Sequence, residues 1–380
     1  MLKLINKSLG VVFFVFFILC TTQQAVFTQT NVVKVPEILQ EDKWIKNNLE
    51  LEKIVQIETT KEHVIGSIRR IILYKDKFII LDSQQPSIFI VDAHTGKVEK
   101  EINSKGRGPG ESNSILDIAF DEKREHILVY NDYEKLLYFN LDGKLLREER
   151  IIGKLFENIT CENDNIIFYN DREGLSCFPH SVDIYNLNTQ KWKTLGKKQK
   201  VDFHIRGRGR IMVKSKNIWF APVLDYGLHL LIGDTIMIPY KLAVKKPITA
   251  DLIKKSSINS PSFHNEVKDR NILFGIQSIR ETEKYLIFTT SLPGLMMMYK
   301  FTLELHGTTY IEDEYLGIKL LNYFPHEGDD NRVMFIVQPH EWMERKPYNQ
   351  NNMPAHLKVQ IKQIRVNEES NPILVFYKEK

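Results

Sequence analysis

The sequence predicts an all-β fold, a six-bladed β-propeller with four-stranded antiparallel blades. Units of about 48 residues repeat along the chain, and each unit holds short apolar runs separated by polar turns. No window of useful length in the sequence has sustained helical periodicity. Aromatic residues make up 11% of the 380 residues, and together with frequent Val and Ile they favour strands.

The first two units give the clearest evidence for the repeat. The run Phe78–Asp82 aligns with Ile127–Asn131 in the next unit. The run that follows, Ser87–Asp92, aligns with Lys135–Asn140. A Gly-containing hairpin comes next in both units. The Asp-Gly pair at 142–143 is a strong hairpin signal, because both central residues of the favoured turn need positive φ.

Four weaker copies follow in the same order of strand, turn and hairpin. Further apolar stretches lie before and after the central runs, which gives about four short strands in each unit. A radial array that closes on itself fits this order better than the alternative, a two-sheet sandwich. The central runs are Asn165–Asn170 with Val182–Asn186, Asn217–Phe220 with His229–Ile232, Lys284–Phe288 with Leu295–Phe301, and Arg332–Val337 with Leu357–Val366 and Pro372–Tyr377.

An N-terminal strand is predicted to close the ring in the last blade. A ring of sheets needs this step, because an unpaired strand edge is open to association. The run Leu51–Glu58 lies before the first unit and is expected to pair beside Pro372–Tyr377. A stray N-terminal strand is the alternative. Between the units, Ile248–Ser257 is the best candidate for a short surface helix.

The chain is divided into a signal peptide at 1–25, a linker at 26–50 and the propeller at 51–380. Lys3 and Lys7 precede an apolar run, Leu9–Leu19, and polar residues follow it, which is typical of an export signal. The run is too short to span a bilayer, which needs about 20 apolar residues. The mature protein is therefore expected outside the cytoplasm, in the periplasm or anchored to the outer membrane in the cell envelope.

Cys20 directly follows the apolar run, and whether it carries a lipid is left open. A cysteine there resembles the lipid-attachment site of bacterial lipoproteins, although Leu19 stands where such sites prefer a small residue. The alternative is an ordinary signal cut near Thr22 or Ala25. Contact with a membrane is expected only through such a lipid anchor.

The composition bears on two questions, whether the protein binds nucleic acid and whether it forms a disulfide bond. Lys and Arg number 52 against 48 Asp and Glu, a net charge of +4, which gives no electrostatic case for nucleic acid. After Cys20, only Cys161 and Cys177 remain among the 3 cysteines. They could form a disulfide bond in an oxidising compartment. The alternative is that both are small buried apolar residues, because a propeller of this length does not need a disulfide for stability.

A Gly-rich segment after the first unit resembles a known family. The segment Lys105–Glu111 (KGRGPGE) is similar to the GxGPGE segment of bacterial envelope six-bladed β-propellers related to the NHL-repeat propellers. The run Ile115–Phe120 and the ending Asn371–Tyr377 fit the same family, and Pro339–Pro354 resembles an insertion. The resemblance covers roughly residues 50–380. It implies a fold and an exported compartment but not a reaction, because members are mostly uncharacterised exported proteins or lipoproteins.

The Gly-rich segment has a structural and a functional interpretation. A phosphate-binding loop is excluded, because its glycines would have to open a helix and end in Lys-Ser or Lys-Thr. The structural interpretation is a tight connector between blades, with the glycines supplying unusual dihedrals. Such connectors lie on the face where the central channel opens. Arg107 and Glu111 are therefore candidate ligand-binding residues.

A basic stretch, KKQKVDFHIRGRGR, lies on the same type of connector further along the chain. It contains His204, Arg206 and Arg208, which could contact an anion or an acidic glycan at the channel mouth, since Arg offers a planar fork to carboxylates. The alternative is a solvated connector between the third and fourth units.

No catalytic pattern is visible, and the predicted function is binding. The sequence has no H-E-x-x-H, no G-x-S-x-G and no calcium-loop spacing, so no catalytic residue, metal ligand or cofactor is predicted. Calcium or another divalent metal held in the channel by several blades stays open. The expected function is an exported, non-catalytic binding or scaffold module that takes a glycan, peptide or other anion at the channel face. The alternative, from similar six-bladed propellers, is a metal-dependent lactonase- or lyase-like enzyme.

Overall fold

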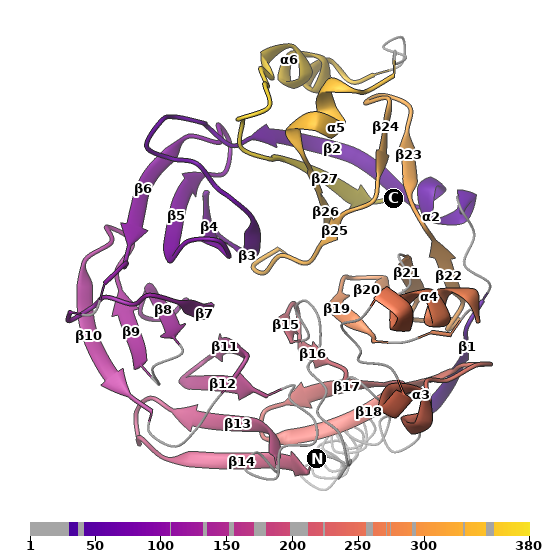
Figure 1. The fold of residues 1–380 in the computed structure, drawn as a ribbon, viewed down its shortest axis with the longest axis horizontal. Coiled ribbons are helices and arrows are strands. Elements are labelled where there is room, and N and C mark those ends of the chain that lie inside the picture. The colour runs from indigo at the N-terminus through magenta and orange to yellow at the C-terminus, as the bar shows by residue number, and fades with distance from the viewer. Residues whose placement is uncertain are drawn as a thin grey trace, which may run out of the picture.

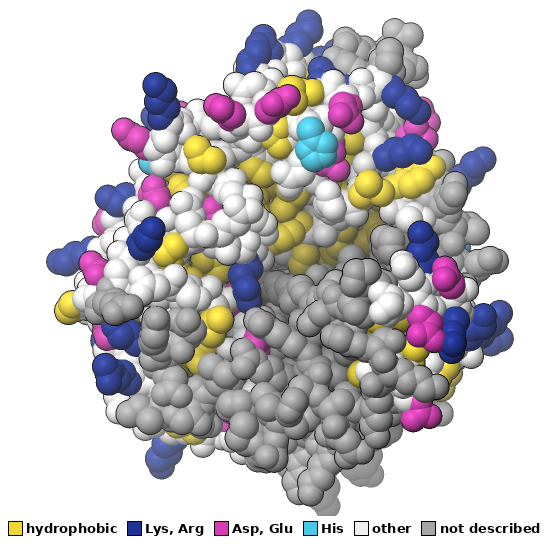
Figure 2. Space-filling view, viewed as in Figure 1, with side chains coloured by type: hydrophobic (Ala, Val, Ile, Leu, Met, Phe, Trp, Pro, Cys, Tyr) yellow, Lys and Arg dark blue, Asp and Glu magenta, His cyan; other side chains and the backbone are white. Residues whose placement is uncertain are grey.

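The fold is a six-bladed β-propeller, and four-stranded antiparallel sheets form its blades (Figure 1). The first strand of each blade lies nearest the central axis. A space-filling view from the same side shows charged side chains around the rim and apolar side chains in a hollow toward the middle (Figure 2). The computed structural model describes residues 30–36, 42–106, 108–131, 135–151, 156–170, 180–197, 212–222, 225–255, 261–270, 272–273, 275–290, 294–329, 331–346 and 353–380.

The first three blades are regular four-stranded meanders. Each follows the chain from its inner strand to its outer strand. Blade 1 comprises β3 (Ile68–Tyr74), β4 (Lys77–Asp82), β5 (Ser87–Asp92) and β6 (Val98–Asn103). Blade 2 comprises β7 (Ile115–Asp121), β8 (His126–Asn131), β9 (Lys135–Phe139) and β10 (Leu145–Arg150). Blade 3 comprises β11 (Asn158–Glu162), β12 (Asn165–Tyr169), β13 (His180–Asn186) and β14 (Trp192–Lys197).

The last three blades carry the additions to the basic pattern. Blade 4 comprises β15 (Val213–Lys214), β16 (Ile218–Phe220), β17 (Gly227–Ile232) and β18 (Thr235–Ala243), with β1 (Asn31–Lys34) as a fifth strand parallel to β18. Blade 5 comprises β19 (Gln277–Glu281), β20 (Tyr285–Thr289), β21 (Leu295–Tyr299) and β22 (Leu305–Thr308). Blade 6 comprises β25 (Tyr323–Phe324), β26 (Arg332–Val337), β27 (Ile373–Glu379) and β2 (Leu49–Gln56).

Five helices and one hairpin lie outside the blades in the part of the chain that is described. The short helix predicted near residue 250 is confirmed as α3. The other helices are not foreseen by the hydrophobic pattern. The elements are α2 (Lys43–Asn47), α3 (Ala250–Lys255), α4 (Pro261–Asp269), α5 (Pro339–Met343), α6 (Ala355–Gln363) and the hairpin of β23 (Ile311–Asp313) and β24 (Ile318–Leu320). None of the helices described is long and apolar enough to cross a membrane.

Both faces of each blade are buried, which explains the continuous apolar runs in the sequence. In β4, the side chains of Phe78 and Ile80 belong to the core shared with blade 6, and those of Ile79 and Leu81 to the core shared with blade 2. Successive strand residues point to opposite faces, so a strand between two neighbours needs apolar residues at every position. The core therefore lies between successive blades.

The predicted ring closure is confirmed. Strand β2 pairs antiparallel with β27, with Leu51 opposite Tyr377, and so supplies the outer strand of the last blade. The N-terminal and C-terminal parts of the chain are thereby joined in one sheet, which leaves no unpaired outer edge on β27.

One expectation for blade 6 is wrong. The run Leu357–Val366, expected as a strand, contains helix α6 instead. Leu357 and Ile361 are spaced by one helical turn, and both are buried against blade 6. The chain thus leaves the blade after β26, forms α5 and α6, and returns as β27.

Each meander gives the disc two different faces. Turns between the first and second strands, and between the third and fourth, lie at one end of each sheet, which we name the turn face. The opposite, connector face carries the loops between second and third strands and the passages from blade to blade. The inner turns of the turn face are residues 75–76, 122–125, 163–164, 215–217, 282–284 and 325–329.

Candidate functional site

The centre of the ring is occupied by a buried cluster of charges around Arg70, which we name the hub. The Arg70 side chain of β3 is fully buried. Its Nη1 atom lies 2.7 Å from Oδ2 of Asp117, and its Nη2 atom lies 2.7 Å from Oε1 of Glu327. Nη1 also donates to the carbonyl oxygen of Ile159, and Glu327 Oε1 accepts a 3.0 Å bond from the backbone N–H of Lys214.

The hub joins five of the six blades at the axis. Arg70, Asp117, Ile159 and Lys214 come from the inner strands of blades 1 to 4, and Glu327 comes from the inner turn of blade 6. Burial opposes the charge of Arg70, but the two carboxylates outweigh this effect and raise its pKa. The single positive charge of Arg70 is thus shared by two carboxylates at the central axis.

The inner turn of blade 6 is held against β3 by its backbone. The N–H of Leu73 donates to the carbonyl of Glu327 at 2.7 Å, and the N–H of Glu327 donates to the carbonyl of Ile71 at 3.1 Å. Gly328 follows with φ +85°, and a Cβ atom there would lie 1.7 Å from the carbonyl oxygen of Leu73. A glycine is required at this close approach, which places the Glu327 carboxylate on Arg70.

Blade 5 is joined to the ring through Glu281 of β19. Its Oε2 accepts from Trp219 Nε1 at 2.9 Å and from Asn217 Nδ2 at 2.7 Å, both in blade 4 or its inner turn. Lys300 Nζ lies 2.9 Å from the other carboxylate oxygen. Burial acts to raise the pKa of Glu281, but these donors outweigh it and lower that pKa. Glu281 is thus a structural carboxylate.

His326 is fully buried beside the hub on the same inner turn as Glu327. Its Nε2 atom lies 3.9 Å from Oδ2 of Asp329. Its ring packs edge-on against the ring of Phe376, with 5.7 Å between the two ring centroids. Burial, with the nearby positive charge of Arg280, lowers the pKa of His326 to about 4. The imidazole is therefore neutral at physiological pH.

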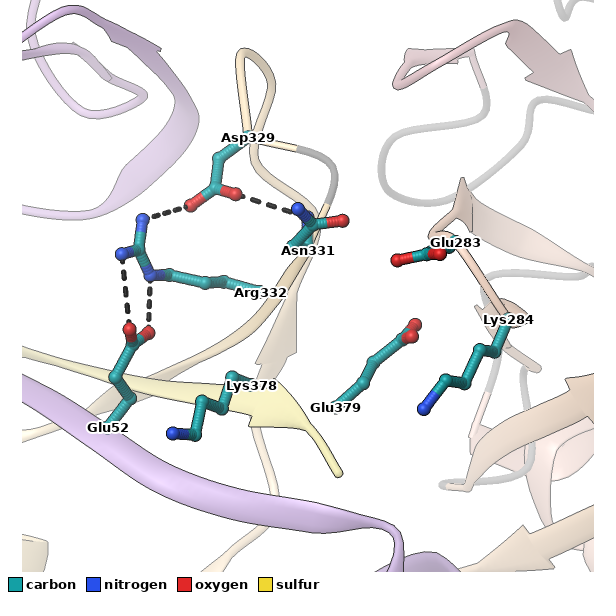
Figure 3. A pocket seen from close by; sticks show the side chains of 8 residues that line it. All are labelled: Glu52, Glu283, Lys284, Asp329, Asn331, Arg332, Lys378 and Glu379. Atoms are coloured by element: carbon teal, nitrogen blue, oxygen red, sulfur yellow. Dashed lines mark hydrogen bonds and ion pairs between the residues drawn. The ribbon is translucent and has the colours of Figure 1, made fainter.

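A pocket of about 370 Å³ opens on the turn face between blades 5 and 6. Figure 3 shows the side chains around it. They come from the inner turn of blade 5, the inner turn of blade 6 and the ends of β2, β26 and β27. The lining residues are Glu52, Glu283, Lys284, Asp329, Asn331, Arg332, Lys378 and Glu379.

One side of the turn-face pocket is an ion-paired network around Arg332. Its Nε atom lies 2.5 Å from Oε2 of Glu52, and its Nη1 atom lies 2.7 Å from Oδ2 of Asp329. Hydrogen bonds to Glu52 and Asp329 outweigh partial burial and raise the pKa of Arg332. Despite partial burial, His326 and Arg332 hold the pKa of Asp329 well below its ordinary value. The positive charge of Arg332 is thus engaged by carboxylates of its own side of the pocket.

The other side of the pocket presents two carboxylates. Figure 3 shows the carboxylates of Glu283 and Glu379 pointing into the same space between Asn331 and Lys284. The Oε1 atom of Glu379 is buried and makes no hydrogen bond with any residue in the described part of the chain. Burial raises the pKa of Glu379 and outweighs the opposing effects of Thr282 and Lys284, and the charge of Glu283 adds to the increase.

The two lysines of the pocket are directed to other acceptors. Lys284 Nζ donates to the carbonyl oxygen of Lys380 at 2.5 Å, and Lys378 Nζ lies 3.3 Å from Oε2 of Glu50. Arg332 is held by its own carboxylates, whereas the charge of Lys284 also acts on Glu379 and opposes the increase in its pKa. An incoming positive charge would still meet carboxylates on the Glu283–Glu379 side.

The Gly-rich connector has the structure that its sequence predicts, and Glu111 lies within it. The carboxylate of Glu111 accepts a 2.8 Å bond from the N–H of Gly108, and the side chain is exposed on the connector face. Gly110 has φ +74°, and a Cβ atom there would lie 2.7 Å from the Leu145 side chain. Glu111 therefore stabilises its own connector, and ligand binding by it stays a prediction.

The other predicted site residues lie outside the described part of the chain. These are Cys20, Arg107, His204, Arg206 and Arg208. Their roles therefore stay predictions.

Cys161 is free and buried, whereas Cys177 lies outside the described residues. Burial raises the pKa of the Cys161 thiol to about 12, so the group is unreactive. Within the described ranges, no group of three or more His, Cys, Asp or Glu side chains is arranged to hold a metal ion.

Comparison with known proteins gives a family and structures of similar fold. The model of the family described as "Domain of unknown function (DUF4934)" matches residues 31–378. A predicted exported protein of Bacteroides fragilis has a similar structure, with a TM-score of 0.71 and 17% identity over 92% of this chain and all of that one. A DUF4221 family member from Bacteroides vulgatus is similar with a TM-score of 0.53 and 13% identity, covering 87% of this chain and 97% of that one. No curated protein matches the sequence.

Proposed function

This chain belongs to the DUF4934 family, and from that premise we propose that it is an exported, non-catalytic binding module. Its turn-face pocket receives a positively charged group, such as a lysine side chain of a peptide or protein partner. The export signal at residues 1–25 and the similarity to a predicted exported protein support the compartment.

The observation that carries this proposal is the pair of carboxylates, Glu283 and Glu379. They face a pocket of about 370 Å³ while the three cations of its lining are bound by other acceptors. A carboxylate whose charged form is disfavoured by burial gains free energy when a cation joins it. The pocket therefore favours a cationic ligand over the anion expected at the connector face.

The hub supports binding at an end face rather than passage through the channel. Arg70, Asp117 and Glu327 fill the axis with groups that satisfy one another. Opening this cluster would leave buried charges unpaired, at a cost of several kcal/mol. A ligand is therefore expected to meet the disc at its surface.

The test measures trilysine binding by isothermal titration calorimetry at about 50 mM salt, where screening is weak. We expect the Glu283→Gln, Glu379→Gln double variant to bind about tenfold more weakly than the unchanged protein. The matched control is Glu125→Gln, an exposed carboxylate on the same face, which should leave the affinity unchanged. Equal binding of triacetyl-trilysine, or no binding of trilysine, would contradict the proposal.

The alternative is a metal-dependent enzyme with its site in the channel. The ligands of such a site would converge from several blades. Asp117 and Glu327 do converge, but on the guanidinium of Arg70, which stands where a cation would. Thermal unfolding with Ca²⁺, Mg²⁺ or Zn²⁺ separates the two functions. A binding module keeps its Tm, whereas a stabilisation lost in Asp117→Asn would favour the enzyme.

A further inference from the structure

A second cavity, of about 350 Å³, lies at the outer rim beside blade 6, and we name it the rim pocket. Three elements that are not part of the six blades meet around it: α2, the β23–β24 hairpin and the segment before α6. Strands β2 and β27 form its inner wall. The lining residues are Lys46, Asn47, Leu49, Glu50, Leu51, Ile311, Glu312, Asp313, Glu314, Tyr315, Pro354, Tyr377 and Lys380.

A buried carboxylate, that of Asp313, forms part of this lining. Asp313 is 7% exposed. Its Oδ2 accepts from the hydroxyl of Tyr377, and its Oδ1 accepts from the N–H of Leu316 at 2.8 Å. Both donors are neutral, and no Lys, Arg or His nitrogen of the described chain lies within ion-pair distance of Asp313. A carboxylate taken out of water without a counter-ion is costly, and burial raises its pKa.

The other acids of the lining already have cations. Lys46 Nζ lies 3.0 Å from Glu314, and Lys378 Nζ lies 3.3 Å from Glu50. Lys346 Nζ lies 3.7 Å from Glu312. Asp313 thus differs from the other three acidic residues, because it combines the deepest burial with purely neutral partners.

Apolar and tyrosine side chains form another part of the lining, beside polar residues such as Lys46, Asn47 and Lys380. Leu49, Leu51 and Ile311 are each at most 5% exposed, and Tyr315 packs against the same core. A cavity that combines apolar side chains with a buried carboxylate suits a ligand that has an apolar body and a positive charge. We infer that the rim pocket binds a small organic amine, whose ammonium group pairs with Asp313 while its aliphatic or aromatic body contacts the leucine and tyrosine side chains.

The test compares tyramine with tyrosol, which replaces the ammonium group by a neutral hydroxyl and keeps the ring. Isothermal titration calorimetry on the purified full chain should show tyramine binding at least about tenfold more tightly than tyrosol. Asp313→Asn keeps an acceptor for Tyr377 and Leu316 but removes the charge, and it should reduce the affinity for tyramine by about tenfold or more.

Two further variants keep the inference falsifiable if Asp313→Asn folds poorly. Glu312→Lys adds a positive charge at a partly exposed position of the same pocket and should also weaken tyramine binding. Glu125→Gln, an exposed carboxylate outside both pockets, should leave it unchanged. The inference is overturned if tyramine does not bind at millimolar concentration, if tyrosol binds as well, or if Glu312→Lys and Asp313→Asn bind tyramine like the unchanged protein.

Discussion

The hub and the turn-face pocket are both built from charged side chains, but the charges of the hub pair with one another, whereas two carboxylates of the pocket face a cavity. In the hub, Arg70 lies 2.7 Å from each of two carboxylates, and all three side chains are at most 5% exposed. In the pocket, Glu283 and Glu379 share a cavity while the nearby cations bind elsewhere. Charge that is buried and paired holds the ring together, whereas charge that faces a cavity without a counter-ion is available to a ligand.

The largest effect is expected from Arg70→Met, which keeps the volume and removes the positive charge. Asp117 and Glu327 would then be buried without a counter-ion, a situation that costs about 3–5 kcal/mol. Urea unfolding followed by circular dichroism measures the loss of unfolding free energy.

Arg124→Met is the matched control for this variant. Arg124 also lies within 3 Å of two carboxylates, Asp121 at 2.8 Å and Asp164 at 2.7 Å, but its side chain is 28% exposed. Water can replace its partners, so the loss should be about 1 kcal/mol or less. Equal losses for the two variants would mean that burial at the hub has no special role.

A second effect is a pH dependence of stability that originates beside the hub, at His326. The unfolded chain takes up a proton on this histidine near its ordinary pKa of 6.5, but the folded protein does so only near 4. Stability is therefore complete above pH 6.5 and falls as the pH drops toward 4, by about 3 kcal/mol. His326→Gln should lose much of this slope between pH 7 and pH 4.5. An unchanged slope in urea unfolding would assign it to other groups.

The blades could be predicted from the sequence because a strand that is buried on both faces is apolar at nearly every position. A run such as Phe78–Asp82 is apolar at nearly every position, and its repetition at propeller spacing fixes the architecture. The closing strand was predictable as well, since the last blade needs an outer strand and Leu51–Glu58 is the apolar run available before the first unit. Helix α6 was not predicted. Its two buried residues, Leu357 and Ile361, are four positions apart, a spacing that also fits the alternation of a strand in the sixth unit.

The hub and the pocket could not be predicted, because their partners are far apart in the chain. Arg70 and Glu327 are separated by 257 positions, and no spacing rule links them. A weaker signal was present: Arg70 and Asp117 each interrupt the apolar run of an inner strand. A charged residue at such a position either faces the central axis or is buried between blades, where an unpaired charge costs free energy. Such interruptions therefore indicate hub residues in other propellers of this kind.

A smaller effect, of the opposite sign, is expected from Glu379→Gln in the turn-face pocket. Burial raises the pKa of this carboxyl, so the folded protein holds its proton more tightly than the unfolded chain does. At neutral pH the ionised form therefore costs stability, and the glutamine variant should be more stable by less than about 1 kcal/mol. The gain should vanish as the pH falls below the ordinary glutamate pKa. A destabilised variant would mean that Glu379 is a structural group like those of the hub.

The smallest effect is expected on the turn face away from the pocket, at Lys75. Its Nζ atom lies 2.7 Å from Oε1 of Glu125, and both side chains are about half exposed or more. Such a pair is screened by water and salt, so Lys75→Gln should leave the unfolding free energy unchanged within the error of the measurement. Trilysine binding should also be unchanged. A loss as large as that of Arg70→Met would show that distance alone, and not burial, decides which ion pairs stabilise this ring, and the contrast between hub and pocket would then need another cause.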